Sequence, residues 1–292
     1  MTENDTRKVA DLERITAKLM GLLGSDPQFA AALPDATIAE AVKAPGMRLA
    51  EMLAVVMEGY GPRPALGERT YRLTTDAAGR TSREFLSDFA TITYAELWRR
   101  VGALASAWRH ESTDVRPGSF VCTAGRAGID YTVADLACIR MGAVAVPLPA
   151  TATESEFTAM LEEVRPAVVC SDMETVGRLS RAVLACSHKP RQLVLLDYQA
   201  ENDEQRQAFE STVAEVGTMF DVDTLQSLTE RGGQYPAISP YIDAEDDNPM
   251  AALCTPRAAQ EPLRPRSARN ACARWRGHQH PWHLRSASPT CR

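Results

Sequence analysis

Residues 142–148 read Gly-Ala-Val-Ala-Val-Pro-Leu, and this short apolar run decides the fold class. A run of this length that closes at Pro147 and Pro149 is typical of a buried strand. Similar apolar runs occur at residues 120–123, 167–170 and 193–196. Helical patterns separate the runs, at residues 129–141, 153–164 and 174–186. Parallel strands joined by right-handed helical crossovers have this alternation, so the sequence predicts a doubly wound α/β fold.

The segments before this alternation are predicted to be a helical lead-in followed by small β elements. Apolar residues at helical spacing (Val9, Leu12, Ile15, Leu19 and Leu22) predict a helix over residues 7–23. A helical turn is expected near residues 29–33, and an amphipathic helix near residues 49–57. Residues 69–75 have a strand pattern, and Asp-Ala-Ala-Gly at 76–79 indicates a turn. The capping box Thr-Tyr-Ala-Glu at 93–96 opens a helix that runs through Trp108.

Residues 199–235 are polar and acidic, with helical patterns around 206–217 and 222–230. We therefore divide the chain into three parts. Residues 1–60 form the helical lead-in, residues 61–250 form the α/β part, and residues 251–292 form a separate tail.

Composition excludes several classes of protein. The chain has 292 residues, of which 45% are hydrophobic and 24% charged, as in a soluble globular protein. No apolar run could span a bilayer, and the polar N-terminus lacks the apolar core of a signal peptide. The seven cysteines form no Cys-x-x-Cys pair, so neither a disulfide framework nor a zinc site is indicated. We expect a reduced, cytoplasmic protein.

The formal net charge of −6 hides a sharp division along the chain. Residues 251–292 carry eight arginines, no lysine and one acid, Glu261, which gives +7. The other 250 residues therefore sum to −13. An acidic body argues against nucleic acid as the main partner, because phosphate binding needs a positive surface.

Few residues of the body suggest chemistry. Residues 123–128, Thr-Ala-Gly-Arg-Ala-Gly, place two glycines between a strand and a helix, but they lack the Gly-x-Gly-x-x-Gly dinucleotide pattern. We interpret them as a tight connection and not as a phosphate cradle. His110 and His188 are interpreted as surface residues. The remaining candidates are four cysteines expected in the core (Cys122, Cys138, Cys170 and Cys186) and two acidic pairs expected on solvated faces (Glu162 with Glu163, and Asp246 with Asp247). We assign no catalytic, cofactor-binding or metal-binding residue.

The order of segments resembles a known family. Three runs are characteristic: Thr-Ile-Thr-Tyr-Ala-Glu-Leu at 91–97, Val-Arg-Pro-Gly-Ser-Phe-Val at 115–121, and the opening run at 142–148. They resemble the N-terminal subdomain of adenylate-forming enzymes, the acyl-CoA synthetase and peptide-synthetase superfamily. The lead-in, with Asp-Pro-Gln-Phe-Ala-Ala-Ala at 26–32 and Pro-Gly-Met-Arg-Leu at 45–49, resembles actinobacterial carboxylic acid reductases.

This resemblance implies a three-step reaction. A fatty or aromatic carboxylic acid and ATP, with Mg, give an acyl-adenylate. A phosphopantetheine arm then takes the acyl group, and NADPH reduces the thioester to an aldehyde. The family implies a first ATP loop, Tyr-Thr-Ser-Gly-Ser-Thr-Gly-x-Pro-Lys, directly after residue 253, where glycine N–H groups and a lysine hold the phosphates. This chain instead reads Cys-Thr-Pro-Arg-Ala-Ala-Gln-Glu-Pro-Leu-Arg at 254–264.

The genetic code connects the two sequences. Suppose that each codon of the original frame begins at the third base of a codon in the present frame. A DNA sequence that encodes residues 254–264 can then also encode Tyr-Thr-Ser-Gly-Ser-Thr-Gly-Ala-Pro-Lys. One lost base near Leu253 would produce this shift. We therefore interpret residues 251–292 as a disordered segment translated out of frame. Its lack of Val, Ile, Phe, Tyr and Met agrees, because such a segment has few groups to bury.

Two functional interpretations of the tail compete with the frameshift. Its arginines and tryptophans could bind nucleic acid by charge and stacking (Arg264, Arg266, Arg269, Arg274, Arg276, Trp275 and Trp282). Its cysteine and histidines could bind a metal, although their spacing fits no standard zinc pattern (Cys272, His278, His280 and His283).

The resulting hypothesis is an inactive fragment of the adenylation domain of a carboxylic acid reductase. No cofactor is expected for the fragment itself, and it is expected to aggregate or to bind chaperones. The alternatives are a remnant of a fatty acyl-CoA ligase and a non-enzymatic binding module with a basic tail.

Overall fold

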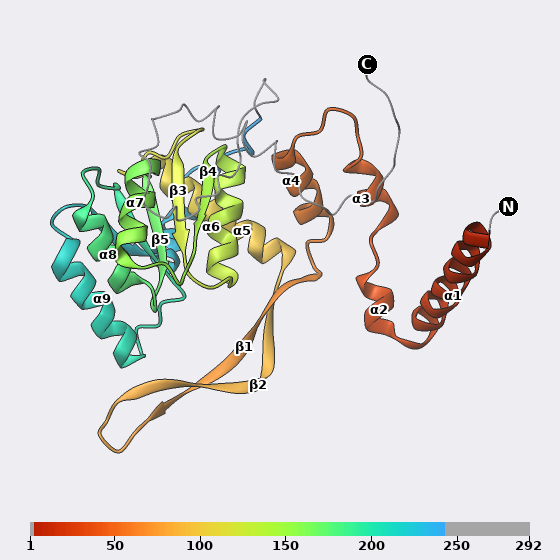
Figure 1. Cartoon of the computed structure of the whole chain (residues 1–292), viewed down its shortest axis with the longest axis horizontal. Helices are drawn as coiled ribbons and strands as arrows, with labels where there is room; N and C mark the ends of the chain where they lie inside the picture. Colours follow the sequence, from red (N-terminus) through yellow and green to blue (C-terminus); the bar gives the residue numbers. More distant parts are fainter. Residues whose placement is uncertain (1–2, 243–292) are drawn as a thin grey trace. The chain divides into compact units, whose positions relative to one another are not determined.

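The structure is a computed structural model that describes residues 3–242, with side chains described from residue 11 onward. The chain divides into two units, Met1–Met47 and Arg48–Arg292, which are described separately (Figure 1). Asp246, Asp247 and every candidate residue of the tail lie outside the described residues.

The first unit is helical. It contains α1 (Glu3–Ser25), α2 (Pro27–Ala32) and α3 (Ala36–Ala41). Asp26 and Asp35 begin the two short helices, because each carboxylate accepts hydrogen bonds from two backbone N–H groups of the first turn. The predicted helix at 7–23 and the helical turn near 29–33 are confirmed. The helix α3 was not predicted.

The second unit begins with α4 (Leu49–Gly59) and a long antiparallel hairpin, β1 (Pro64–Thr75) and β2 (Thr81–Thr93). Figure 1 shows the hairpin as a twisted ribbon that projects from the sheet, and Thr81 near its tip donates a hydrogen bond to Asp203 at the start of α9. Asp76 closes the turn, because its carboxylate accepts hydrogen bonds from the N–H groups of Ala78 and Arg80. The predicted strand and turn are confirmed within a longer hairpin.

The centre of the second unit is a parallel five-stranded sheet of β3 (Phe120–Ala124), β4 (Val144–Leu148), β5 (Val168–Asp172), β6 (Gln192–Leu196) and β7 (Asp221–Thr224). Its strand order is β4-β3-β5-β6-β7, and every neighbouring pair is parallel. The doubly wound α/β fold predicted from the four apolar runs is confirmed.

Helices cover both faces of this sheet, which makes three layers. One face packs against α4, α5 (Tyr94–His110), α6 (Ile129–Met141) and α10 (Leu225–Gly232). The other face packs against α7 (Glu154–Val164), α8 (Val176–Ala185) and α9 (Asp203–Val216). Successive strand residues alternate between the layers, so Val168 belongs to the first core and Val169 to the second.

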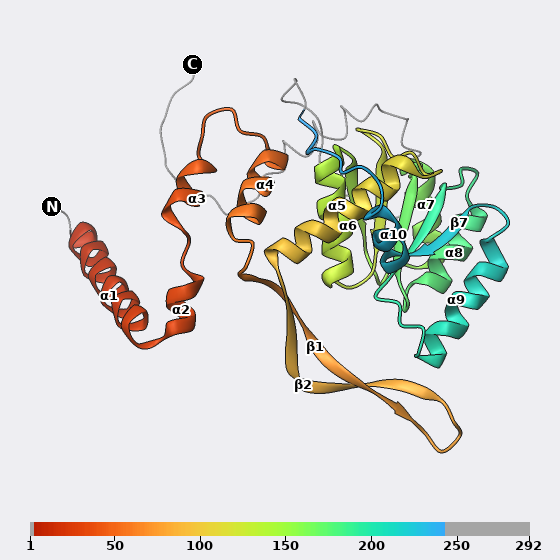
Figure 2. The ribbon, with the colours of Figure 1, turned by 180° about the vertical axis from the view of Figure 1, so that it is seen from behind.

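The helix predicted around residues 222–230 is wrong in its first part. Residues 221–224 form β7, the edge strand seen from behind in Figure 2, and α10 begins only at Leu225. The sequence of β7, Asp-Val-Asp-Thr, contains no apolar run. A strand at the edge of a sheet does not need one, because its polar side chains can reach solvent. Thr224 ends the strand and caps α10 through a hydrogen bond from the Ser227 N–H.

A strap, defined here as residues 234–242, returns across α5 and α6 at the end of the described chain. The Arg140 guanidinium donates two hydrogen bonds to the Ile238 carbonyl, and the Tyr241 N–H donates to the Arg140 carbonyl. Gly142 has a φ of 72°, and a Cβ at this position would lie 2.3 Å from Cδ1 of Tyr241. Only glycine therefore allows the Tyr241 ring to lie on the C-terminal end of α6.

Candidate functional site

The order of the strands identifies where a ligand site would be expected. The chain leaves β3 for β4 on one side, and later returns to place β5 on the other side of β3. Open α/β sheets bind ligands at the carboxyl ends of the strands that flank such a reversal. The relevant loops are residues 125–128, which follow β3, and residues 173–175, which follow β5.

The Asp172 side chain fills this position. Its Oδ2 accepts a hydrogen bond from the Arg126 N–H at 2.9 Å, and its Oδ1 accepts one from the Thr175 N–H at 2.9 Å. Gly125 has a φ of 147°, and a Cβ there would lie 2.9 Å from Asp172 Cγ. The glycine therefore serves a close approach between loop and carboxylate, which confirms the tight connection predicted for residues 123–128.

A second group of carboxyl groups lies at the end of β6. We call Glu68, Asp130 and Asp197 the acidic root cluster, since they meet where the hairpin joins the sheet. The Glu68 Oε1 accepts a hydrogen bond from the Ile129 N–H at 2.7 Å. The Asp130 Oδ2 accepts one from the Asp197 N–H at 2.8 Å.

The electrostatics of this cluster are unusual. Burial, followed by the negative charges of Asp130 and Glu68, raises the pKa of Asp197 to about 7. Burial also raises the pKa of Asp130. Arg83 opposes the shift at Asp197 but does not cancel it. A carboxyl group with a pKa near neutrality can gain or lose a proton under physiological conditions.

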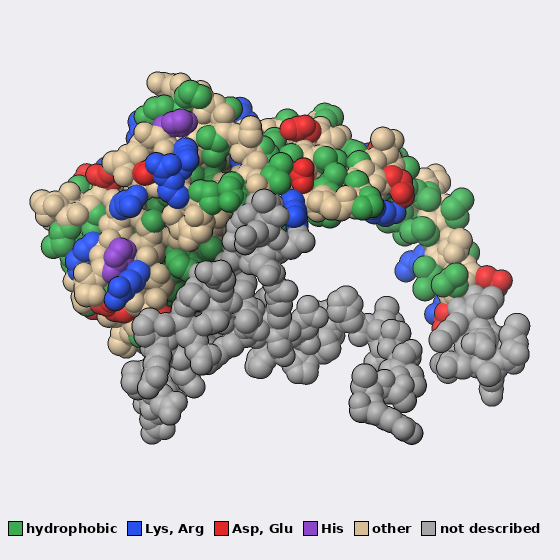
Figure 3. All heavy atoms as spheres, turned by 90° about the horizontal axis from the view of Figure 1, so that it is seen from above, with side chains coloured by type: hydrophobic (Ala, Val, Ile, Leu, Met, Phe, Trp, Pro, Cys, Tyr) green, Lys and Arg blue, Asp and Glu red, His purple; other side chains and the backbone are tan. Residues whose placement is uncertain are grey.

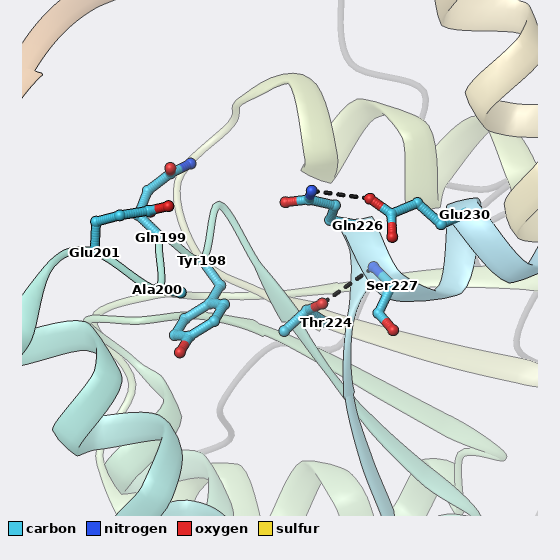
Figure 4. Close-up of a pocket in the computed structure, with 8 residues that line it drawn as sticks. All are labelled: Tyr198, Gln199, Ala200, Glu201, Thr224, Gln226, Ser227 and Glu230. Atoms are coloured by element: carbon cyan, nitrogen blue, oxygen red, sulfur yellow. Dashed lines mark hydrogen bonds between the residues drawn. The ribbon is translucent and has the colours of Figure 1, made fainter.

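A third feature is a polar hollow of about 410 Å³ beside the ends of β6 and β7 (Figure 4). Its lining residues are Tyr198, Gln199, Ala200, Glu201, Thr224, Gln226, Ser227 and Glu230. The Gln226 side chain donates a hydrogen bond to Glu230 at 3.0 Å. The lining includes two carboxylates and no lysine or arginine, so the hollow is a poor match for a phosphate or another anion.

The two histidines do not form a catalytic arrangement. The His110 ring stacks on Tyr235 with a centroid distance of 5.6 Å. His188 Nε2 lies 3.1 Å from the Pro166 carbonyl oxygen. They belong to different parts of the fold, at the end of α5 and in the loop after α8. Neither is brought to the carboxyl ends of β3 and β5.

The four cysteines of the body are buried, as predicted. Burial raises the pKa of Cys170 to about 12, and it raises that of Cys138 well above the usual range. Such thiols are poor nucleophiles, because the reactive thiolate is disfavoured. These cysteines are therefore core residues.

The acidic pair at 162–163 divides. Glu163 is exposed, as predicted for a solvated face. Glu162 is only partly exposed, and its carboxylate accepts hydrogen bonds from the backbone N–H and the hydroxyl of Ser187. Glu162 therefore joins α7 to the loop after α8 at the surface, through Ser187.

Two further features limit the chemistry of the described part of the chain. Over residues 3–242, no group of three or more His, Cys, Asp or Glu side chains could hold a metal ion. No helix in the same range is long and apolar enough to cross a bilayer. On the face drawn in Figure 3, basic side chains lie in separate groups among acidic, apolar and uncharged ones, unlike a continuous nucleic-acid-binding surface.

Comparison with known proteins gives a consistent result. Residues 73–254 match the family described as AMP-binding enzyme. The carboxylic acid reductase of Mycobacterium tuberculosis (strain ATCC 25618 / H37Rv) is 41% identical over 236 residues, which are 80% of this chain and 20% of that protein. The carboxylic acid reductase of Segniliparus rugosus is 35% identical over 281 residues, which are 92% of this chain and 23% of that protein.

Among solved structures, the A domain of the Segniliparus rugosus reductase, in complex with AMP and a co-purified carboxylic acid, is similar with a TM-score of 0.77 and 36% identity. The match covers 81% of this chain and 38% of that chain. The chain thus spans about a fifth of the length of the curated relatives it matches.

Proposed function

Because the chain belongs to the AMP-binding enzyme family, we propose that it supplies the N-terminal part of an acid-activating adenylation domain. The observation that carries the proposal is the match to the reductase A domain, which extends over 81% of this chain at 36% identity. The parent activity we propose is that of a carboxylic acid reductase, which forms an acyl-adenylate from ATP and an acid. Phosphopantetheine and NADPH would serve later steps outside the described residues.

The described residues do not themselves fit ATP and Mg. The Asp172 carboxylate uses the N–H groups of Arg126 and Thr175 at the strand reversal. Glu68 uses the Ile129 N–H at the N-terminus of α6, where a phosphate would otherwise find a donor. Residues 3–242 also offer no metal-binding group. We therefore derive no catalytic step from these residues and propose that the 292-residue chain does not adenylate acids.

We further propose that the tail at residues 251–292 is translated out of frame from near Leu253 onward. Two observations support this: residues 254–264 can encode the family's ATP loop in the shifted frame, and the match to the family ends at residue 254. Sequencing the gene through codons 245–292 tests the idea. One additional base near codon 253 would restore the loop. A reading that confirms the present frame, with no loop sequence in either shifted frame, would overturn it.

Two assays test separately whether the chain is part of an adenylation domain and whether the 292-residue chain is inactive. ATP–pyrophosphate exchange with a panel of fatty and aromatic acids should remain at background for the 292-residue chain. Exchange above background would contradict inactivity. A chimera that joins residues 1–253 to the remainder of the Segniliparus rugosus A domain should exchange. A folded but inactive chimera would contradict the proposed role of these residues.

A further inference from the structure

The hairpin is attached to the sheet and its helices near both of its ends. Near its tip, the Thr81 N–H donates a hydrogen bond to Asp203 Oδ2 at 2.6 Å, at the first residue of α9. Near its root, Glu68 accepts from the Ile129 N–H at the first residue of α6. Each attachment joins a carboxylate to a backbone donor, so the charge of that carboxylate determines its strength.

The root attachment is crowded by other carboxyl groups. A Cβ at Gly128 would lie 3.1 Å from Asp197 Oδ2 and 3.3 Å from Glu68 Oε1, so both carboxyl groups converge on the same piece of backbone. Asp197 has a φ of 54°, which turns the chain sharply after β6. Its N–H is held by the Asp130 carboxylate. Three carboxyl groups, from β1, α6 and the end of β6, therefore share one small volume.

The charges that face Asp197 come from four elements. Asp130 on α6, Glu68 on β1 and Asp172 on β5 are acidic and disfavour its ionised form. Arg83 on β2 favours the ionised form, but its guanidinium also lies over the rings of Tyr71 and Phe85. Burial and the three acidic groups outweigh Arg83, and the pKa of Asp197 is raised to about 7.

The tip attachment has the opposite electrostatics. The Thr81 N–H, followed by Arg206, lowers the pKa of Asp203. Asp203 therefore stays ionised and bound throughout the neutral range, whereas Asp197 titrates within it. The root cluster thus has a carboxyl group that titrates near neutrality, and the tip attachment does not.

We propose that the acidic root cluster is a proton-controlled joint between the hairpin and the sheet. With Asp197 protonated, Glu68 remains bound to the N-terminus of α6. With Asp197 ionised, repulsion among Glu68, Asp130 and Asp197 loosens that attachment, while the tip stays bound to Asp203. The loosening is local to Glu68 and Ile129, because Leu66 and Ile92 keep the hairpin root packed against the core. This inference concerns only the described residues and does not depend on the proposed function.

The raised pKa of Asp197 determines how the closed form of the joint depends on pH. An Asp whose pKa is raised in the closed joint favours the closed form most below its ordinary pKa, near 4. This preference declines as the pH rises and is lost above about 7. The protection of the Ile129 amide against hydrogen exchange should therefore fall by up to about tenfold per pH unit between pH 5 and 7, and then level off.

Hydrogen exchange on the full chain, corrected for the intrinsic rate at each pH, tests this. Asp197→Asn removes the charge and keeps a residue that tolerates positive φ, so its Ile129 protection should not vary between pH 5 and 8. Glu68→Gln keeps an acceptor oxygen and should weaken the slope. Asp88→Asn removes an exposed charge from the same hairpin and should behave as the unmodified chain.

The Thr81 amide distinguishes the joint from general unfolding, because its protection should stay constant while that of Ile129 falls. Three results would overturn the proposal. They are a pH-independent Ile129 amide in the unmodified chain, an Asp197→Asn variant that keeps the slope, and Thr81 and Ile129 amides that lose protection together.

Discussion

Gly142 is required both by its backbone conformation, which has a positive φ, and by its packing under the Tyr241 ring. Gly118 and Gly142 have similar positive φ values, 81° and 72°, but only Gly142 lies under another side chain, the Tyr241 ring. Gly118→Ala should lower the free energy of unfolding by about 1–2 kcal/mol, the cost of a left-handed alanine. Gly142→Ala should cost at least about 1 kcal/mol more, because the Tyr241 ring must also move. Urea unfolding of both variants would measure the difference, and equal losses would contradict the packing argument.

Asp197 should also govern part of the pH dependence of stability. Its pKa is raised in the folded chain, so its stabilising contribution is complete below about pH 4 and lost as the pH rises through about 7. Relative to the unmodified chain, Asp197→Asn should be more stable at pH 7.5 than at pH 4.5 by about 3 kcal/mol. Urea midpoints at the two pH values would measure this. A difference of opposite sign would rule out the assigned shift.

At the scale of elements, α7 illustrates how a local sequence signal fixes a boundary. The Thr153 hydroxyl accepts from the Glu156 N–H, and the Glu156 carboxylate accepts from the Thr153 N–H. Thr153→Ala should lower the free energy of unfolding by about 1 kcal/mol. Thr158→Ala, the same change inside the helix, should be nearly neutral, because alanine is the better helix former. Thermal unfolding would measure both variants. Equal losses of stability would contradict the stabilising role of the Thr153 cap.

The elements found correctly from the sequence are those with strong local signals. The apolar runs of β3, β4, β5 and β6 and the capped helices α5 and α7 needed no knowledge of distant residues. The strand β7 escaped prediction, because its pairing with β6 and not its own polar sequence makes it a strand. The helix α3 escaped because it is only one and a half turns long and depends on the Asp35 cap.

The acidic root cluster could not be predicted in the same way. Glu68, Asp130 and Asp197 lie about sixty residues apart in sequence, and each is an ordinary acid locally. One usable signal was present: Asp197 directly follows the apolar run of β6, where carboxyl ends of parallel strands collect functional groups. The shift in its pKa depends on burial and on four charged partners from other elements, which only the fold brings together.

At the scale of the whole molecule, the hairpin presents large apolar side chains to solvent. Phe85 and Phe89 are 53% and 65% exposed. Such side chains promote association. Phe85→Thr combined with Phe89→Thr should reduce aggregation and the binding of an apolar dye, with little loss of stability, because threonine keeps the strand propensity. Thr74→Ser on the same hairpin is the control. Unchanged dye binding would place the association surface elsewhere.

The order of the strands has a consequence for synthesis on the ribosome. After β3 and β4 have paired, β5 adds beside β3, β6 beside β5 and β7 beside β6. Each strand of this sheet from β4 onward therefore finds a neighbour already made when it emerges. Of the described residues, the strap at 234–242 emerges last and fastens onto α6, a helix completed about a hundred residues earlier. The sheet can thus assemble one strand at a time during translation, in step with the emerging chain.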